Sequence, residues 1–403
     1  MTHQAGRHFL NIPGPTNVPE RVLSATHQAV IDHRSADFAE LALGLLGEVK
    51  KVFKTKGPVV IFPSSGTGAW EAAMVNTLSP GDGVLMYEVG QFATLWADMA
   101  KNLGLKVDFI ASDWRTGVEA DKIEEKLRAD KAHAIKAVCV VHNETATGIT
   151  SNVVQVRHAM DRANHPALLM VDTISSLASI DYRHDEWGVD VAIGGSQKGL
   201  MLPPGISFNA IGARALEANK TARLARAYFD WQGMLEPNKS GFFPYTPATN
   251  LLYGLEEAIK MLFEEGLDNV FARHERLAEA TRRAVQAWGL ENQCVNPAEY
   301  SATITAIRMP EGHDADKLRG VILEKFNMAL GAGLAKVKGK VFRIGHLGDF
   351  NDLMLAGALS GVEMGLSLAG VPFQRGGVDA ALDFLAHGDA AQSAAKPKRV
   401  ARA

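Results

Sequence analysis

The sequence predicts an α/β protein with a mostly parallel sheet that is covered by helices on both faces. Short apolar runs, typical of buried strands, alternate along residues 59–211 with segments whose apolar residues recur at helical spacing. This alternation is typical of βαβ units, whose crossover helices cover both faces of a parallel sheet. The composition agrees, since hydrophobic residues make up 47% and charged residues 22% of the 403 positions, close to the average for a globular protein.

Each element of this pattern follows from its local sequence. Runs such as Val59-Val60-Ile61-Phe62 are short and apolar, as expected of buried strands. The expected strands are 59–62, 83–87, 107–110, 135–141, 167–172, 189–193 and 206–211. The segments between them predict amphipathic helices, which are expected at 68–78, 93–103, 121–128 and 153–162.

The beginning of the chain and its central part predict an arm and a large domain. Residues 1–30 are expected to form the arm, because the three prolines from Asn11 to Pro19 exclude a helix there. The large domain is expected over residues 31–285. Two long helical segments, 250–265 and 267–288, follow its last strand.

The remaining residues predict a second, smaller unit. Residues 286–388 mix strand and helix patterns, which indicates a C-terminal α+β domain. Its expected elements are the strands 302–309 and 340–345 and the helices 315–326 and 349–369. The alanine-rich segment 389–403 is expected to be a disordered tail.

Charge and cysteine content exclude several classes of partner. The 42 Lys and Arg residues against 45 Asp and Glu give a net charge of -3, so no nucleic-acid partner is expected. No apolar stretch reaches the length of a membrane helix, and residues 1–10 lack a signal core. A cytoplasmic location and no membrane partner are therefore expected. Cys139 and Cys294 are too few for a disulfide framework and lack metal-ligand spacing, so no metal is expected.

Two strand ends carry opposite charges. Asp172 closes the apolar run 167–172, and Lys198 follows the run 189–193. One cofactor, pyridoxal phosphate, requires both groups, because its aldehyde needs a lysine and its ring nitrogen needs an acid. Taken alone, a lysine after a strand is more often a surface residue.

A third strand end carries small residues and hydroxyls. Ser65-Gly66-Thr67-Gly68 follows the strand 59–62 and opens a helix, and free amides at a helix N-terminus attract phosphate. Serine and threonine are also ordinary N-caps, so both interpretations stay open here. The spacing matches neither a Walker A loop nor the dinucleotide-binding fingerprint. Because ligands of open α/β sheets bind beyond the carboxyl ends of the strands, the three strand ends are expected to share one edge.

These residues stand within motifs that resemble a known family. The sequence resembles the class V aminotransferases, which have fold type I and use pyridoxal 5'-phosphate, and within them the glyoxylate-using branch. The resemblance runs from about Asn11 to Leu385. The matching segments are Pro13-Gly14-Pro15-Thr16, His33-Arg34-Ser35, Ser65-Gly66-Thr67-Gly68, His142-Asn143-Glu144-Thr145-Ala146-Thr147-Gly148, Val171-Asp172, Gly195-Ser196-Gln197-Lys198-Gly199, Tyr245-Thr246-Pro247 and Phe342-Arg343-Ile344-Gly345.

The resemblance implies roles for the residues that would hold the cofactor. Lys198 would bind the aldehyde as a Schiff base, and Asp172 would pair with the pyridine nitrogen. Phe92 would stack on the ring. Thr145 would lie near the phenolic oxygen, with Thr147 as the competing choice. The phosphate would be held by Ser65, Gly66, Thr67 and Gln197.

The resemblance also implies a substrate site and a homodimer with active sites at the subunit interface. Arg343 would bind the substrate carboxylate, because a guanidinium matches a carboxylate in two places. On the sequence alone, an internal salt bridge of Arg343 stays open. Gly14 would also contact the substrate. The residues that would reach the neighbouring subunit's site are His33, Arg34, Tyr245 and Thr246.

The activity implied is a ping-pong transfer of the amino group of L-serine to glyoxylate, which gives hydroxypyruvate and glycine. Small amino acids and keto acids are then the expected substrates. His33, Arg34 and Asn17 are candidates for binding the serine hydroxyl. Transfer from alanine to glyoxylate is the alternative within the family. Two further functions stay open, a carbon–sulfur lyase with Cys294 as nucleophile and a nicotinamide-binding or non-enzymatic α/β protein.

Overall fold

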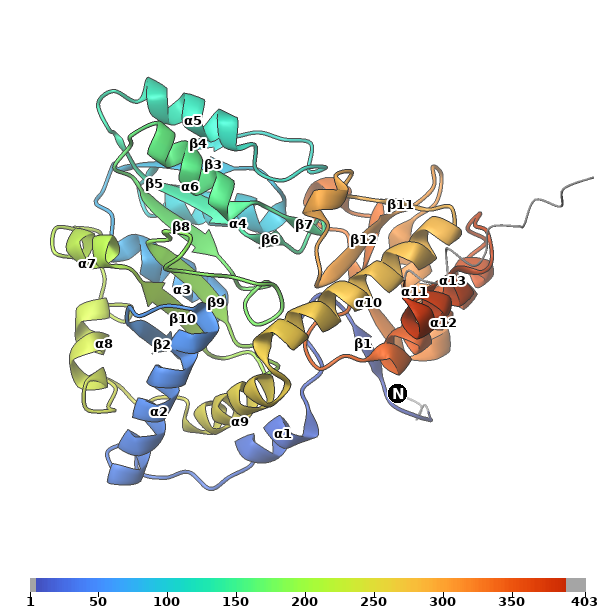
Figure 1. Cartoon of the computed structure of the whole chain (residues 1–403), viewed down its shortest axis with the longest axis horizontal. Helices are drawn as coiled ribbons and strands as arrows, with labels where there is room; N and C mark the ends of the chain where they lie inside the picture. Colours follow the sequence, from blue (N-terminus) through green and yellow to red (C-terminus); the bar gives the residue numbers. More distant parts are fainter. Residues whose placement is uncertain (1–4, 389–403) are drawn as a thin grey trace, which may run out of the picture.

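The polypeptide is organised around two β-sheets that lie side by side (Figure 1). The structure is a computed structural model and describes residues 5–388. The disordered tail predicted for 389–403 therefore lies outside the described residues. Among the described residues, no helix is both long enough and apolar enough to cross a membrane.

The larger sheet has seven strands and is parallel except for one of them. Its spatial order is β2-β10-β9-β8-β5-β3-β4, and β10 (Ser207–Ile211) is antiparallel to both neighbours. The other strands are β2 (Val59–Phe62), β3 (Gly83–Tyr87), β4 (Lys106–Ile110), β5 (Ile135–Val141), β8 (Leu168–Asp172) and β9 (Val191–Gly195). The predicted α/β class with a mostly parallel sheet of seven strands is confirmed.

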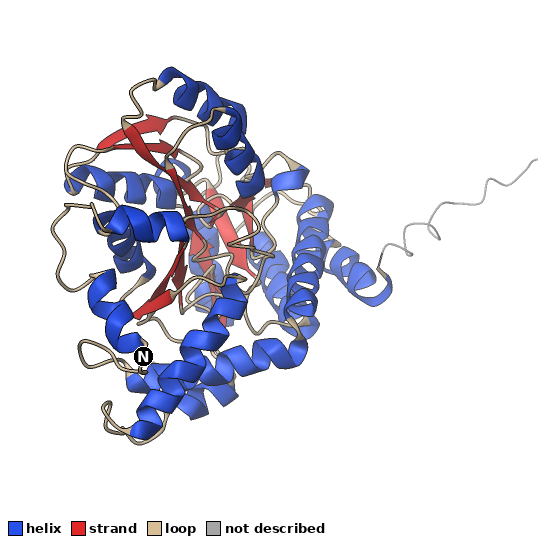
Figure 2. Cartoon of the chain, turned by 60° about the vertical axis from the view of Figure 1, so that its left-hand side comes forward, coloured by secondary structure: helices blue, strands red, loops and turns tan. Residues whose placement is uncertain are grey.

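Helices lie on both sides of this sheet (Figure 2). The edge strand β2 and the inner strands β8, β9 and β10 are buried along their whole length, as expected of a sheet covered on both faces. The helices of this half are α2 (Ala36–Phe53), α3 (Gly66–Val75), α4 (Gln91–Asn102), α5 (Ala120–Ala129), α6 (Val153–Arg162), α7 (Ala213–Asn219), α8 (Trp231–Asn238) and α9 (Thr249–Glu265).

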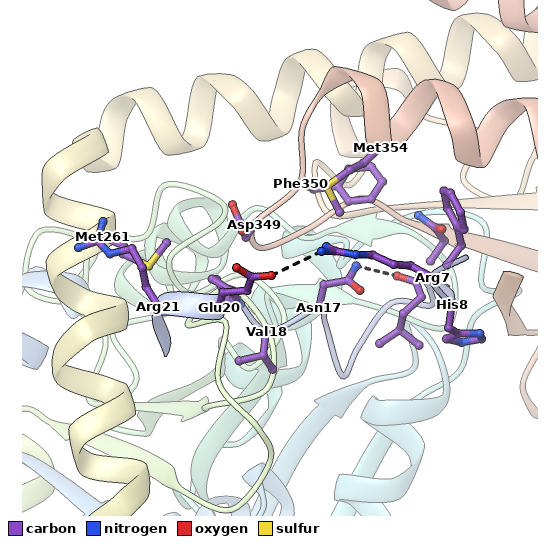
Figure 3. Close-up of a pocket in the computed structure, with 14 residues that line it drawn as sticks. Arg7, His8, Asn17, Val18, Glu20, Arg21, Met261, Asp349, Phe350 and Met354 are labelled. Carbon is purple, nitrogen blue, oxygen red and sulfur yellow. Dashed lines mark hydrogen bonds and ion pairs between the residues drawn. The ribbon is translucent and has the colours of Figure 1, made fainter. Parts of the chain in front are cut away.

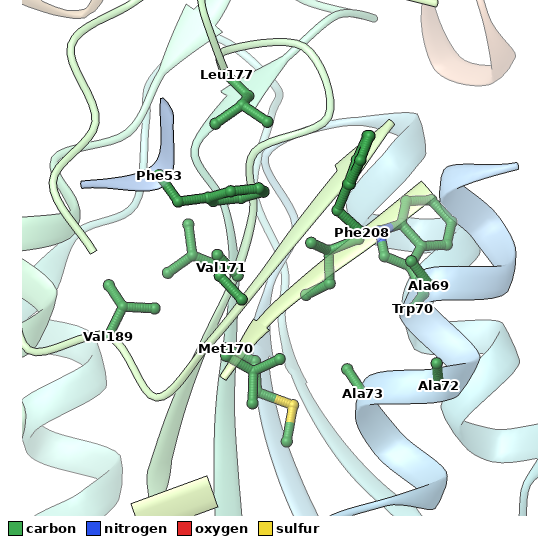
Figure 4. Close-up of a cluster of buried hydrophobic side chains, with 14 of the residues drawn as sticks. Phe53, Ala69, Trp70, Ala72, Ala73, Met170, Val171, Leu177, Val189 and Phe208 are labelled. Carbon is green, nitrogen blue, oxygen red and sulfur yellow. The ribbon is translucent and has the colours of Figure 1, made fainter. Parts of the chain in front are cut away.

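The interior of the large half is one continuous cluster of apolar side chains. Figure 4 shows part of it, where Trp70 of α3 lies near Phe208 of β10 and Phe53 of α2 lies near Val171 of β8. Phe53 and Phe208 have ring centroids 6.3 Å apart. This packing holds α2 and α3 against the sheet and so fixes the loop before α3.

The smaller sheet has the order β1-β13-β14-β12-β11. Its strands are β1 (Phe9–Asn11), β11 (Glu291–Asn292), β12 (Ile304–Arg308), β13 (Met328–Ala332) and β14 (Val341–Gly345). The helices beside it are α10 (Leu267–Ala287), α11 (Ala315–Phe326), α12 (Asp352–Leu368) and α13 (Gly377–His387). A second apolar cluster fills this half, and α10 joins it from Leu277 onward, whereas Val270 belongs to the first cluster. The predicted domain boundary at 285 stays a prediction.

The arm contains regular structure that its sequence did not predict. Strand β1 pairs in parallel with β13 of the smaller sheet, and α1 (Glu20–Thr26) follows the proline-rich stretch. Helices α2 and α13 and strand β13 were also not predicted, and β9 begins two residues later than expected. The segment 12–18 between β1 and α1 crosses from the small sheet to the edge of the large one, where Thr16 N donates to Gln197 O at 3.1 Å.

Candidate active site

A cavity of about 230 Å³ lies beyond the carboxyl ends of β8 and β5. The cavity therefore lies at the edge of the sheet where ligands of open α/β proteins are expected. Nine predicted site residues line it, and they are Gly14, Ser65, Gly66, Thr67, Phe92, Thr145, Asp172, Gln197 and Lys198. Pro15, Trp70, Val141, Asn143, Ile174 and Ser175 complete the lining. The three strand ends expected to share one edge do meet there.

Lys198 is the buried amine of this cavity. Its side chain follows β9, is 8% exposed, and its Nζ donates a hydrogen bond to the carbonyl oxygen of Pro13 in the arm. Burial lowers the pKa of Lys198 to about 8, and the positive charge of Arg343 acts in the same direction. The carboxylates of Asp172 and Glu144 oppose this shift. The amine is therefore available in its neutral, nucleophilic form closer to neutral pH than an ordinary lysine.

The lowered pKa predicts how cofactor uptake depends on pH. Only the neutral amine attacks an aldehyde, so the rate at which the unloaded protein binds pyridoxal phosphate covalently should rise with pH and level off above about 8. Stopped-flow absorbance measures this rate. Arg343→Gln should move the midpoint upward, because it removes a charge that lowers the pKa of Lys198. A midpoint near the ordinary lysine value of 10.5 in the unaltered protein would contradict the prediction.

Gly14 leaves the space that Lys198 occupies. A Cβ at this position would overlap the Lys198 side chain, and its φ of +110° disfavours any other residue. Thr16 in the same segment holds the lysine loop, since its Oγ1 donates to Lys198 O at 3.3 Å. The arm thus forms one wall of the cavity.

Gly14→Ala should therefore block cofactor attachment through a clash at Lys198. We expect at least a tenfold fall in the affinity of the protein for pyridoxal phosphate, measured by equilibrium absorbance titration. Gly6→Ala is the matched control, because Gly6 also has a positive φ of +87° but no atom lies within 4 Å of its added Cβ. Equal effects of both substitutions would show that backbone strain, rather than the clash, is responsible.

Asp172 is held by two hydrogen bonds at the end of β8. Its Oδ2 accepts from Trp70 Nε1 at 3.0 Å, and its Oδ1 accepts from Ile174 N at 2.7 Å. Burial raises its pKa to about 6, while both hydrogen bonds and Lys198 favour the charged form. Each carboxylate oxygen keeps a second lone pair, so the group still accepts a proton-bearing ring nitrogen. Trp70, which stacks on Trp96 with 5.8 Å between centroids, is a site residue that the sequence reasoning missed.

The loop before α3 has the features of a phosphate site. Ser65 occupies the N-cap position without making a capping hydrogen bond, so the first amides of the helix lack a side-chain acceptor. A Cβ on Gly66 would overlap Ile174, so glycine lets the loop pack closely there. Gln197 lies at the same cavity, and its buried Oε1 has no hydrogen-bond partner among the described residues. Free donors at a helix N-terminus fit the phosphate of pyridoxal phosphate.

The remaining walls come from α4 and from the segment after β5. Phe92 is the second residue of α4 and lines the cavity. Thr145 lines it as well, whereas Thr147 Oγ1 donates away from it to Val89 O at 3.2 Å. Asn143 Nδ2, which the sequence reasoning also missed, donates to Ser175 Oγ at 3.0 Å. Of the two threonines, Thr145 is the one placed to meet a ligand.

Arg343 lies on β14 behind Thr145 and is not among the lining residues. Its side chain is 7% exposed; Nη1 donates to Thr145 O at 2.6 Å and Nε to Ala332 O at 2.8 Å. Burial lowers its pKa to about 10, and Glu144 opposes the shift. Within the described residues Arg343 forms no ion pair, so the internal salt bridge left open by the sequence is absent there. A guanidinium bonded only to carbonyls keeps donors for a carboxylate.

Four predicted residues lie apart from the cavity in this single chain. Tyr245 stacks on Tyr228 with 4.4 Å between ring centroids, and Thr246 and Arg34 are exposed. His33 Nε2 is buried without a hydrogen-bond partner among the described residues. Their assignment to a neighbouring subunit's site stays a prediction.

A larger cavity of about 720 Å³ lies beside the arm, and neither Lys198 nor Asp172 lines it. Figure 3 shows Asn17 with Arg7, Glu20 and Asp349 around it. Asn17, a candidate for binding the serine hydroxyl, lines this cavity and donates to Leu10 O at 3.1 Å. Lysine is not among the residues described as lining it. Asn17 therefore does not face Lys198 here.

Neither the lyase alternative nor a metal site finds support in the arrangement. Cys294 is 3% exposed and lies outside the lining of the Lys198 cavity. Burial raises its pKa to about 11, the opposite of a reactive thiolate. In the part of the chain that the structure describes, no group of three or more His, Cys, Asp or Glu side chains could hold a metal ion.

Comparison with known proteins agrees with the geometry. The family described as Aminotransferase class-V matches residues 8–345. A serine–glyoxylate aminotransferase of Methylorubrum extorquens is 54% identical over 95% of this chain and 97% of its own length. An L-aspartate–glyoxylate aminotransferase of Paracoccus denitrificans is 50% identical over 92% and 94%.

A solved structure shares the whole architecture. The ureidoglycine–glyoxylate aminotransferase of Bacillus subtilis superposes with a TM-score of 0.88 at 25% identity, covering 96% of this chain and 100% of that one. The family match spans more than half of the chain and includes the lysine, the aspartate and the loop before α3. The chain therefore belongs to the class V aminotransferases, which work with pyridoxal phosphate.

Proposed function

We propose that this protein transfers the amino group of L-serine to glyoxylate and gives hydroxypyruvate and glycine. The observation that carries the proposal is the buried pair of Lys198 and Asp172, which line the same cavity. The identity of about half to a serine–glyoxylate aminotransferase over nearly the whole chain supports the choice of substrates.

The residues of the chain divide the work of the reaction. Bound pyridoxal phosphate supplies the aldehyde that carries the amino group and the ring that accepts electrons. Lys198 Nζ, with its pKa near 8, takes the proton from the substrate Cα and later returns one. Asp172, held by Trp70 and Ile174, keeps its charge toward the ring nitrogen. Burial of both groups excludes water from the proton transfer.

Arg343 and Thr145 complete the scheme on the substrate side. Arg343 would bind the substrate carboxylate and so orient the Cα proton toward Lys198. The hydroxyl of the substrate serine would form hydrogen bonds with the side chains of Thr145, Ser175 and Asn143, which line the cavity. Both half-reactions use the same groups, because each step runs in reverse when glyoxylate enters.

The lining favours a small neutral donor over a dicarboxylate. Lys198 is the only cationic side chain among the described residues that line the cavity, so a second substrate carboxylate lacks an obvious partner. Alanine remains the alternative donor. A site that hydrogen-bonds a hydroxyl discriminates against analogues that lack it, so serine is expected to be preferred.

The proposal is tested by comparing amino donors with glyoxylate as acceptor. We expect kcat/KM to be highest for serine, lower for alanine and lowest for aspartate, measured by keto-acid formation from purified, cofactor-loaded protein. A preference for alanine or aspartate by more than about tenfold, or about 1.4 kcal/mol, would refute serine as the natural donor.

We also propose that the enzyme acts as a homodimer in the cytoplasm. The support is that Tyr245 and Thr246, which the motifs assign to a cofactor site, and His33, which they assign to a substrate site, do not line the cavity of their own chain. Light scattering of the loaded enzyme tests this proposal. A monomeric mass with full activity would contradict it.

A further inference from the structure

Glu144 is a buried carboxylate beside the cavity that has no part in the proposed chemistry. It follows Asn143 in β6 (Asn143–Glu144) and is 0% exposed. Its Oε2 accepts hydrogen bonds from Phe92 N at 3.0 Å and Ala93 N at 3.1 Å. Its Oε1 accepts one from Ala146 N at 3.0 Å. Burial raises the pKa of Glu144 to about 7, while the three backbone amide donors favour its ionised form.

The first two hydrogen bonds connect Glu144 to the aromatic wall. Phe92 N and Ala93 N belong to the first turn of α4, whose amides have no acceptor within the helix. Gly90, at the N-cap of α4, leaves the space for the carboxylate: a Cβ there would lie 2.5 Å from the Glu144 carboxyl carbon. The position of Phe92 at the cavity is thus set by the carboxylate that caps its helix.

The third hydrogen bond connects Glu144 to Arg343. The Ala146 N–H that Glu144 accepts and the Thr145 carbonyl that binds Arg343 Nη1 belong to the same planar peptide unit. Glu144 therefore binds the N–H of this peptide unit, and Arg343 binds its carbonyl oxygen. Rotation of the plane would move the carbonyl away from the guanidinium.

We propose that Glu144 is a positioning residue, which fixes the ring wall at Phe92 and the carboxylate-binding Arg343 relative to one another. The inference rests on the proposed function, because it assigns a substrate carboxylate to Arg343. It acts through hydrogen-bonded backbone and not through its charge. The charged groups that interact electrostatically with Glu144 are Asp172, Lys198 and Arg343.

A role of Glu144 through its charge and a role through its hydrogen bonds predict opposite effects of Glu144→Gln on carboxylate binding. Above about pH 7, where most of the Glu144 side chain is ionised, loss of its negative charge alone would make the cavity more positive and would tighten the binding of a carboxylate. Loss of position would weaken it, because an amide nitrogen in place of either oxygen faces a backbone N–H and leaves at least one buried donor unpaired. Gly90→Ala displaces the same carboxylate without changing its charge.

The probe is propionate, a carboxylate that carries no amine and does not react. We expect Glu144→Gln and Gly90→Ala each to weaken its binding to the loaded enzyme about tenfold, measured by titrating the visible absorbance. The KM for serine should rise by a similar factor, with a smaller change in kcat. Glu88→Gln is the control: Glu88 is also buried and accepts from Trp114 Nε1 at 3.2 Å, but it does not line the cavity.

Glu144→Gln should add little to the loss of propionate affinity in Arg343→Gln, because the arginine that Glu144 positions is then already absent. Unchanged or tighter binding of propionate in both single variants would overturn the inference. An unaltered enzyme that binds propionate but does not turn over serine would refute the proposed function and leave the role of Glu144 standing.

Discussion

Lys198→Ala will give a folded protein that binds pyridoxal phosphate without a covalent bond and has lost transamination. The variant lacks the only amine of the described cavity lining, and with it both the attachment point and the group that moves the Cα proton. General acid–base catalysis alone contributes about 10² to 10⁴-fold, so kcat should fall by at least about 10³-fold. Steady-state rates with serine and glyoxylate measure the loss.

The fold should tolerate this substitution, because a buried amine with a lowered pKa is costly to keep in the interior. The melting temperature of the unloaded protein should therefore stay close to the unaltered value or rise. Lys220→Ala is the control, since Lys220 pairs with Glu217 on the surface. Substantial activity in Lys198→Ala, or an equal loss in Lys220→Ala, would contradict the assignment of Lys198.

Asp172→Asn is the second substitution with a large expected effect. Asparagine has nearly the same shape but carries no charge, so the ring nitrogen loses the group that keeps it protonated. Its amide nitrogen would also face the N–H of Trp70 or of Ile174, both of which donate to the carboxylate. Removing one preorganised electrostatic group from an active site costs about 10² to 10³-fold in kcat, and we expect a loss in this range.

The matched control for Asp172→Asn is Asp190→Asn. Asp190 is a buried carboxylate that accepts from Leu169 N at 2.8 Å and does not line the cavity. Its substitution should lower the melting temperature and leave kcat of the folded protein near the unaltered value. Rates of the serine half-reaction, followed by absorbance, separate the two effects. A loss in Asp172→Asn of less than threefold would contradict the role of Asp172.

The parts of the site that the sequence predicted are those carried by strand ends. Lys198, Asp172 and Ser65 each follow an apolar run, and a parallel sheet brings such ends to one edge. Their meeting therefore follows from the α/β pattern itself. The family motifs added Phe92, Thr145 and Gln197, which line the same cavity.

The site residues that the sequence reasoning missed are those whose role depends on the direction of a side chain or on a backbone atom. Trp70 looks like one more apolar residue of a helix until its indole nitrogen is seen to point at Asp172. The Pro13 carbonyl that Lys198 contacts is backbone, and no side-chain pattern reports it. Glu144 stands within one of the family motifs, but its role depends on the approach of α4 and of Arg343, which are far away in sequence.

The small sheet was harder to predict for a related reason. Strand β1 has three residues and is completed only by its pairing with β13. Strand β13, Met328-Ala329-Leu330-Gly331-Ala332, carries no β-branched side chain, so local propensity does not mark it as a strand. Both strands owe their conformation to long-range pairing.

The covalent bond between Lys198 Nζ and pyridoxal phosphate is the feature on which the proposed catalysis depends most. Reduction of the loaded enzyme with borohydride followed by peptide mass mapping tests it directly. We predict the reduced pyridoxyl group on the peptide that contains Lys198 and on no other lysine in stoichiometric amount. An unmodified Lys198 in fully loaded, active enzyme would contradict this bond and the role of Lys198 with it.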